Sequence, residues 1–179
     1  MTTNPPLLLV VWHSRTGAAR QMADAVVRGA HAVATEFAHD QPAMAESCLL
    51  NVCQRSADTV DSSLLLRAAG YVFCTPENLG SMTGTMKEFF DRNYYAVLDS
   101  VAGRPYGAII AAGTDGHGAR QQLERIVTGW RLRAVAPTVV IRNGAQTPEE
   151  ILAPKTIPAT DLERCAELGG LVAGTLLLA

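Results

Sequence analysis

The sequence predicts an α/β fold in which helices cover both faces of an open, five-stranded parallel sheet. Apolar runs of strand length, such as residues 7–12, lack the alternation of a half-exposed strand, which is typical of strands buried on both faces. These runs alternate with segments of helical periodicity, as a parallel sheet requires. The 179 residues suit one domain with a sizeable core, and no repeat or composition shift divides them, so we expect a single domain over residues 1–179.

The first strand and helix are the clearest elements. Residues 7–12 form an unbroken apolar run, and residues 18–33 carry apolar side chains at helical spacing on one stripe. The polar residues 35–42 are expected to form a loop. A second short strand is expected within residues 43–53, centred on residues 48–52, where the neighbouring residues are poor strand formers.

The middle of the chain predicts a helix, a strand and a second helix. Residues 57–69 have a helical pattern with Asp61 or Ser62 as the cap. Residues 71–75 form a third buried strand that we expect Pro76 to end, and the loop that follows leads into a helix over residues 83–99.

Two further strand and helix pairs complete the pattern. Residues 104–113 predict a fourth strand and residues 119–132 a helix. Residues 134–141 predict a fifth strand, in which Pro137 indicates an edge or a bulge. A long connection over residues 143–158 then precedes a final helix over residues 159–178.

Composition excludes several classes of function. The chain is 48% hydrophobic with a formal net charge of −2 and has no basic block, which argues against disorder and nucleic-acid binding. It has no signal-peptide pattern and no apolar run approaching the ~18 residues that span a bilayer. The cysteines Cys48, Cys53, Cys74 and Cys165 lack metal-ligand spacing, so we expect free thiols, no metal site and a cytoplasmic protein.

The turn after the first strand is a candidate anion site. A buried strand turning sharply into a helix leaves free backbone N–H groups, and the helix dipole adds partial positive charge. Ser14 and Thr16 supply hydroxyl groups at the same place. A phosphate cradle and an ordinary capped turn are both compatible with this stretch. His13 either contacts the phosphate or packs beneath the turn, and Arg15 either serves as the countercharge or points into solvent.

The loops after the first, third and fourth strands are the ones whose residues look equipped to bind a ligand. Ligands of open parallel sheets bind at the carboxyl ends of the strands, where the strand order reverses. In a sheet with the strand order 2-1-3-4-5, these three loops lie side by side. The clustering therefore predicts one ligand bound by all three.

Each of the three loops resembles part of a known flavin site. Residues 14–17 resemble the phosphate loop of flavodoxin-like FMN proteins, and residues 113–118 resemble the third, glycine-rich loop of the WrbA-type proteins among them. Residues 75–87, followed by Phe-Phe-Asp-Arg at 89–92, resemble the second flavin loop of the WrbA-type NAD(P)H:quinone oxidoreductases. The chain is therefore similar to that group and to the NADPH-dependent FMN reductases, which implies a three-layer flavodoxin-like sandwich with strand order 2-1-3-4-5.

The resemblance implies three groups of FMN contacts. The first loop would bind the phosphate through backbone N–H groups and hydroxyls, the second would line the isoalloxazine ring, and the third would close the other side. The implied cofactor-binding residues are Ser14, Arg15, Thr16, Gly17, Ala18, Ala19, Pro76, Glu77, Asn78, Leu79, Gly80, Gly113, Thr114, Asp115, Gly116, His117 and Gly118. His117 is also a candidate proton donor to a reduced quinone, or a structural residue of its loop.

The chain departs from the related proteins in ways that bear on function. Ala19 stands where the phosphate loop usually ends in Thr, and Glu77 predicts a more acidic substrate pocket. The ring-side loops contain no Trp or Tyr, and the net charge is nearly neutral, whereas electron-transfer flavodoxins usually stack aromatic residues on the ring and are strongly acidic. These last two features favour an open flavin face that accepts a small molecule.

The resulting hypothesis is an FMN-dependent oxidoreductase that carries electrons from NAD(P)H to a quinone or similar small acceptor. The resemblance further implies a homodimer or homotetramer. Two alternatives stay open: a flavodoxin-type electron-transfer protein, and a flavodoxin-like domain that has lost FMN. Ala19 and the long connection leave room for the second alternative.

Overall fold

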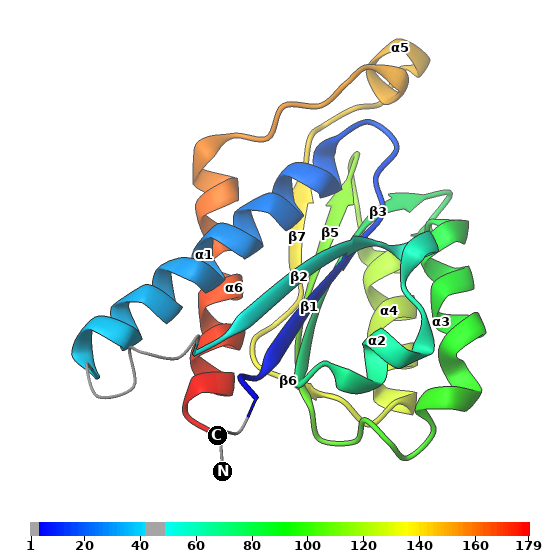
Figure 1. Ribbon diagram of the computed structural model, residues 1–179. Coiled ribbons are helices and arrows are strands. Elements are labelled where there is room, and N and C mark those ends of the chain that lie inside the picture. The colour runs from blue at the N-terminus through cyan, green and yellow to red at the C-terminus, as the bar shows by residue number, and fades with distance from the viewer. Residues whose placement is uncertain (1–3, 42–48) are drawn as a thin grey trace.

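The computed structural model, which describes residues 4–41 and 49–179, has three layers (Figure 1). A parallel sheet forms the middle layer. The helices α1 (Ala18–Asp40) and α6 (Ala159–Leu177) cover one face, and α2 (Ser62–Arg67), α3 (Gly84–Val97) and α4 (His117–Gly129) cover the other. Each face has its own apolar core, so the central strands are buried from both sides, as their unbroken apolar runs predict.

The strand order confirms the flavodoxin-like topology. The main path is β2 (Asn51–Ser56), β1 (Leu7–Trp12), β3 (Gly70–Asn78) and β5 (Pro105–Ala112), all parallel. The predicted fifth strand is divided into β6 (Arg133–Ala134) and β7 (Val139–Arg142), both paired with β5. Pro137 lies in the gap and has no N–H to offer a ladder, so the strand breaks there.

The first helix is longer than predicted. The expectation of a loop over residues 35–42 is wrong as far as Gln41, because α1 continues to Asp40 and Gln41 is its C-cap; Pro42 lies outside the described residues. The added turns follow the contact between α1 and α6, where Val33 packs close to Gly170. The helix therefore extends beyond this contact into polar sequence.

The second strand and the helix after it also differ from the prediction. Of the expected strand at 48–52, Cys48 lies outside the described residues, and β2 begins at Asn51 in register with Leu7 of β1. The predicted helix over 57–69 is divided into a 3-10 turn, η2 (Ala57–Thr59), and α2. Asp61 is the N-cap of α2 and accepts a hydrogen bond from the Leu64 N–H at 2.8 Å, as one of the two predicted caps.

The third strand continues past Pro76, where we expected it to end. The β1 strand ends opposite Cys74, so no neighbour on that side needs an N–H from Pro76, which pairs in register with Ala111 of β5. Beyond it, β3 folds back as a hairpin onto β4 (Ser81–Met82). The long connection after β7 contains a short helix, α5 (Pro148–Leu152), which begins with a capping box between Thr147 and Glu150.

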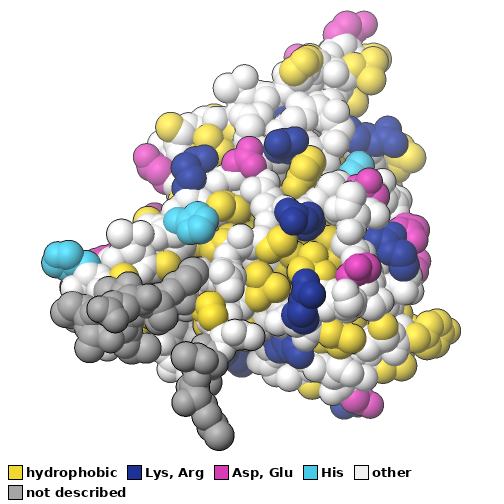
Figure 2. Space-filling model, in the orientation of Figure 1, with side chains coloured by type: hydrophobic (Ala, Val, Ile, Leu, Met, Phe, Trp, Pro, Cys, Tyr) yellow, Lys and Arg dark blue, Asp and Glu magenta, His cyan; other side chains and the backbone are white. Residues whose placement is uncertain are grey.

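Figure 2 shows charges of both signs intermixed over one face of the molecule. Within the described residues, no helix combines the length and the apolar character that crossing a bilayer requires.

Candidate functional site

A cavity of about 670 Å3 lies at the carboxyl ends of β1, β3 and β5. The three loops predicted to share one ligand all contribute to its wall, together with the connection after β7. The lining residues are Arg15, Thr16, Ala18, Pro76, Glu77, Asn78, Leu79, Gly80, Ala111, Ala112, Gly113, Thr114, Asn143, Ala145, Ile151, Leu152 and Lys155. The fold therefore brings the three loops together at one end of the sheet, as the strand order predicts.

The first loop presents a set of unused hydrogen-bond donors. Gly17 is the N-cap of α1 with φ of +89°, a conformation that glycine adopts without strain. Within the described part of the chain, the backbone N–H groups of residues 15–19 have no acceptor. The helix dipole of α1 adds to these donors, and the exposed Arg15 lies on the cavity wall.

The Ser14 hydroxyl is the most informative atom of this loop. It is buried, and no partner for it exists among the described residues. A buried polar group without a partner costs about 1–3 kcal/mol, so such groups are rare unless a ligand satisfies them. An orphaned hydroxyl beside unpaired N–H groups at a helix N-terminus fits the phosphate of FMN, and it favours the cradle over an ordinary capped turn.

His13 packs beneath the turn. Its Nδ1 lies 3.0 Å from Thr83 Oγ1, and that hydroxyl lies 3.2 Å from Thr75 Oγ1, so a partly buried chain of polar groups joins the first and second loops. Burial, reinforced by the charge of Arg15 and opposed by Asp58, lowers the pKa of His13 below its ordinary value. The structure thus places this side chain as a support of the loops.

The second loop is a tight hairpin. Glu77 pairs with Met82 and Asn78 with Ser81, and the two turn residues between them both have positive φ, +51° at Leu79 and +68° at Gly80. Such a turn matches the twist of a two-residue hairpin, although Leu79 is an unusual residue for its first position. The turn holds the Leu79 side chain fully exposed at the edge of the cavity.

The Glu77 carboxylate caps a helix. It accepts hydrogen bonds from the N–H groups of Gly116, at 2.7 Å, and Ala119, at 3.2 Å, at the start of α4. The N-terminus of α4 therefore already has its anion, whereas that of α1 is free to receive one. Sequence reasoning placed Glu77 on the cavity wall but missed this role, because the pairing joins residues about 40 positions apart.

The third loop divides into two parts. Gly113 and Thr114 line the cavity, whereas Asp115, Gly116, His117 and Gly118 are outside its lining. His117 is the exposed first residue of α4. Gly118 permits close packing on the hairpin, since a Cβ atom there would lie 1.9 Å from the Gly80 carbonyl oxygen.

The connection after β7 supplies a wall that sequence reasoning missed. Asn143, Ala145, Ile151, Leu152 and Lys155 all line the cavity. Figure 1 shows α5 standing above the carboxyl ends of the strands, and none of its residues is buried. The capping-box sequence Thr147-Pro148-Glu149-Glu150 was the available signal for this helix, but nothing in it indicates where the helix lies.

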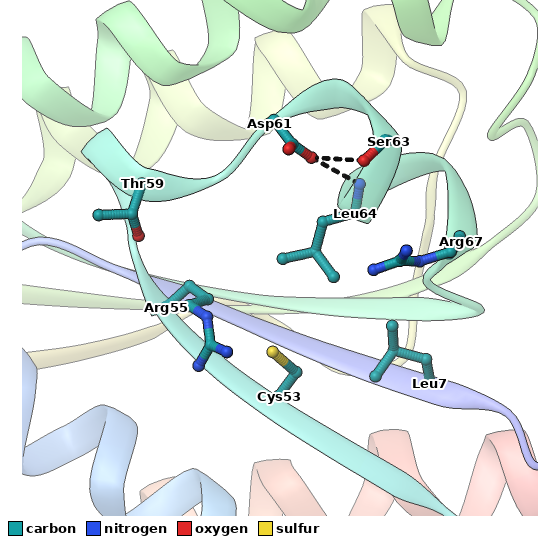
Figure 3. A pocket seen from close by; sticks show the side chains of 8 residues that line it. All are labelled: Leu7, Cys53, Arg55, Thr59, Asp61, Ser63, Leu64 and Arg67. Atoms are coloured by element: carbon teal, nitrogen blue, oxygen red, sulfur yellow. Dashed lines mark hydrogen bonds between the residues drawn. The ribbon is translucent and has the colours of Figure 1, made fainter.

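A second cavity, of about 500 Å3, lies beside the edge strand β2 (Figure 3). Arg55 and Arg67 contribute to its wall with the thiol of Cys53, which is free, as are the buried Cys74 and Cys165. Asp61 also lines it, but one carboxylate oxygen is committed to Ser63 and the Leu64 N–H. None of the three predicted loops reaches this cavity, so the site at the strand ends is the candidate for the predicted ligand.

The sequence profile of the NADPH-dependent FMN reductase family matches residues 9–146. The chain belongs to this family. The match spans all three loops and confirms the resemblance inferred from them, and it supports an FMN-linked oxidoreductase in general terms. No curated protein sequence matches the chain.

Solved structures share the fold. A flavodoxin from the domain Archaea is 17% identical to this chain with a TM-score of 0.71, and the alignment covers 95% of this chain and 98% of the flavodoxin. A WrbA-like flavodoxin from Agrobacterium tumefaciens is 16% identical with a TM-score of 0.70, and the alignment covers 96% of this chain and 97% of that protein. An oxidoreductase from Corynebacterium diphtheriae is 22% identical with a TM-score of 0.68, covering 98% of each chain. These similarities establish the three-layer, flavodoxin-like architecture.

Proposed function

We propose that the protein binds FMN at the ends of β1, β3 and β5 and transfers electrons from NAD(P)H to a quinone or similar small acceptor. The observation that carries the proposal is the buried Ser14 hydroxyl, which has no partner in the described chain and lies beside the free N–H groups of residues 15–19. The family to which the chain belongs supports the same cofactor.

The phosphate end of FMN would lie at α1. Ser14, Thr16 and the N–H groups of residues 15–19 would donate to it, and Arg15 would supply a positive charge. Ala19 has no hydroxyl to donate, but its backbone N–H remains a donor. The N-terminus of α4, at the same end of the sheet, already receives the Glu77 carboxylate and is not available to the phosphate.

The ring end would lie between the hairpin and the third loop. Pro76, Asn78, Gly80, Gly113 and Thr114 line this part of the cavity and would orient the ring through backbone groups. Bound FMN would supply the redox chemistry, taking a hydride from NAD(P)H and passing two electrons to the acceptor. The protein's contribution is to bind and orient both molecules, so the proposal requires no catalytic acid or base, and His117 keeps only the candidate role given by the resemblance.

The acceptor side of the cavity favours an apolar molecule. Leu79, Ile151 and Leu152 are exposed aliphatic side chains on its wall, from the hairpin and from α5. No aromatic side chain lines the cavity in the described part of the chain, so the ring would be left open instead of stacked. Both features support a small-molecule acceptor over a flavodoxin-type role as a protein-to-protein electron carrier.

Absorption spectroscopy and steady-state kinetics test the proposal. The purified protein, mixed with FMN and freed of unbound flavin, should retain the paired visible bands of flavin. With NADH or NADPH as donor it should then reduce benzoquinone. A protein that cannot be loaded would favour the alternative of a domain that has lost FMN, and a loaded protein without turnover would favour the electron carrier. Light scattering on the same sample tests the proposed homodimer or homotetramer.

A further inference from the structure

A segment of the connection crosses the start of α1. Residues 153–157, here called the strap, join α5 to α6 and contact the first loop through a backbone hydrogen bond. The Lys155 N–H donates to the Thr16 carbonyl oxygen at 2.8 Å. At the far end of the strap, Ile157 is buried in the core between the sheet and the helices α1 and α6.

One side chain joins the strap to the loop. Gln21, in the first turn of α1, donates from Nε2 to the Lys155 carbonyl oxygen at 2.6 Å and to the Gly17 carbonyl oxygen at 3.1 Å. Its Oε1 accepts a hydrogen bond from the Ile157 N–H at 3.2 Å. The nitrogen and the oxygen of the Gln21 amide are therefore both hydrogen-bonded, and they hold the strap at Lys155 and Ile157, on either side of Thr156.

The hydrogen bonds to the Thr16 and Gly17 carbonyl groups also fix the direction of the N–H groups that follow them in the chain. In a planar trans peptide the C=O and the following N–H point in opposite directions. Lys155 holds the Thr16 carbonyl, which sets the direction of the Gly17 N–H, and Gln21 holds the Gly17 carbonyl, which sets that of the Ala18 N–H. Both N–H groups are among the unpaired donors of the proposed phosphate site.

Lys155 makes its own side-chain bonds to α5. Its Nζ donates to the carbonyl oxygens of Glu150, Ile151 and Ala153, which closes the C-terminal end of that helix. The wall that carries Ile151 and Leu152 is therefore linked through Lys155 to the loop that would bind phosphate.

We propose that Gln21 is a positioning residue that fastens the strap to the phosphate loop, so that binding of the FMN phosphate and ordering of the strap are coupled. This inference rests on the proposed function, because it takes the anion at α1 to be the phosphate of FMN. Riboflavin, which has the same ring but no phosphate, does not engage the coupling.

The test compares FMN and riboflavin affinities in two variants. Gln21→Met removes all the amide bonds but keeps the length and helix propensity of the side chain. Gln121→Met, at an exposed position of α4, is the matched control. We expect Gln21→Met to weaken FMN binding about tenfold, measured by quenching of flavin fluorescence, and to leave riboflavin binding and the control unchanged. An equal loss for both flavins, or no loss, overturns the proposal.

Hydrogen exchange gives a second measurement that does not depend on activity. The amides of Lys155 and Ile157 should exchange slowly in the wild type, more slowly with FMN, and fast in Gln21→Met with little response to FMN. If they stay protected in Gln21→Met, the fastening is refuted even where FMN binding falls. If the wild type does not prefer FMN to riboflavin, the phosphate assignment of the proposed function fails, whereas the exchange rates of the flavin-free protein still decide whether Gln21 fastens the strap.

Discussion

Ser14 illustrates how one residue can indicate a ligand. Its hydroxyl is buried without a partner among the described residues, whereas the buried hydroxyls of Thr75 and Thr83 bond to one another. The free protein bears the cost of this unpaired group, and binding of an anion would remove it. Removing the hydroxyl should therefore not destabilise the free protein but should weaken anion binding, so the assignment can be tested.

Replacing Ser14 should separate binding from stability. In Ser14→Ala we expect the flavin-free protein to be as stable as the wild type or more stable, by up to about 1 kcal/mol, because an unsatisfied hydroxyl is removed. FMN affinity should fall about tenfold, because one donor to the phosphate is lost. Urea unfolding and fluorescence titration measure the two effects. Loss of stability without loss of affinity would show that Ser14 is structural.

His13 predicts a pH dependence of stability. Its pKa is lowered in the folded protein, chiefly by burial, so between its ordinary value of 6.5 and the lower folded value the unfolded chain binds more protons. The free energy of unfolding should therefore fall as the pH decreases below about 6.5. In His13→Gln this part of the dependence should disappear, whereas His31→Gln, at an exposed position of α1, should keep it. Urea unfolding at pH 7.5 and 5.5 measures the difference.

At the scale of elements, the cavity depends on short segments held by polar contacts. The hairpin after β3 is tied to α4 through Glu77, and α5 is closed by its capping box and by Lys155. Neither segment contributes a large apolar side chain to the core beyond Met82. Substitutions on their exposed sides should therefore change binding more than stability.

Ile151 provides such a test. It lines the cavity and is 53% exposed, as is Leu171 on α6, which serves as the matched control. Ile151→Gln should raise KM for an apolar quinone about fivefold, because roughly 1 kcal/mol of apolar contact is lost. We expect kcat, the FMN affinity and the urea midpoint to stay near wild-type values. An equal change in Leu171→Gln would refute a specific contact.

At the scale of the whole molecule, close contact between α1 and α6 covers one face of the sheet. A Cβ atom at Gly29 would lie 1.9 Å from the Ala166 carbonyl oxygen, and one at Gly169 would lie 2.1 Å from the Val26 carbonyl oxygen. The two helices therefore pack backbone to backbone at these glycines.

Two glycine substitutions should have opposite effects on stability. Gly169→Ala should lower the free energy of unfolding by about 2–3 kcal/mol, because its methyl group meets backbone that cannot move aside easily. Gly129→Ala, in the last turn of α4 with open space around it, should raise stability by about 0.5–1 kcal/mol through helix propensity. Urea unfolding of both variants decides. Equal effects would mean that α1 and α6 are less closely packed.

The sequence by itself determined the alternation of elements and the position of the three loops at the ends of strands, whereas the strand order came from the resemblance to flavodoxin-like proteins. These features depend on local periodicity, on turn residues and on the rules of parallel sheets, all of which are visible in a short stretch of chain. Only the tertiary structure decided that Glu77 caps α4 and that the strap lies on Thr16. Each of these depends on a contact between residues distant in sequence, and no local pattern specifies which polar group such a residue will meet.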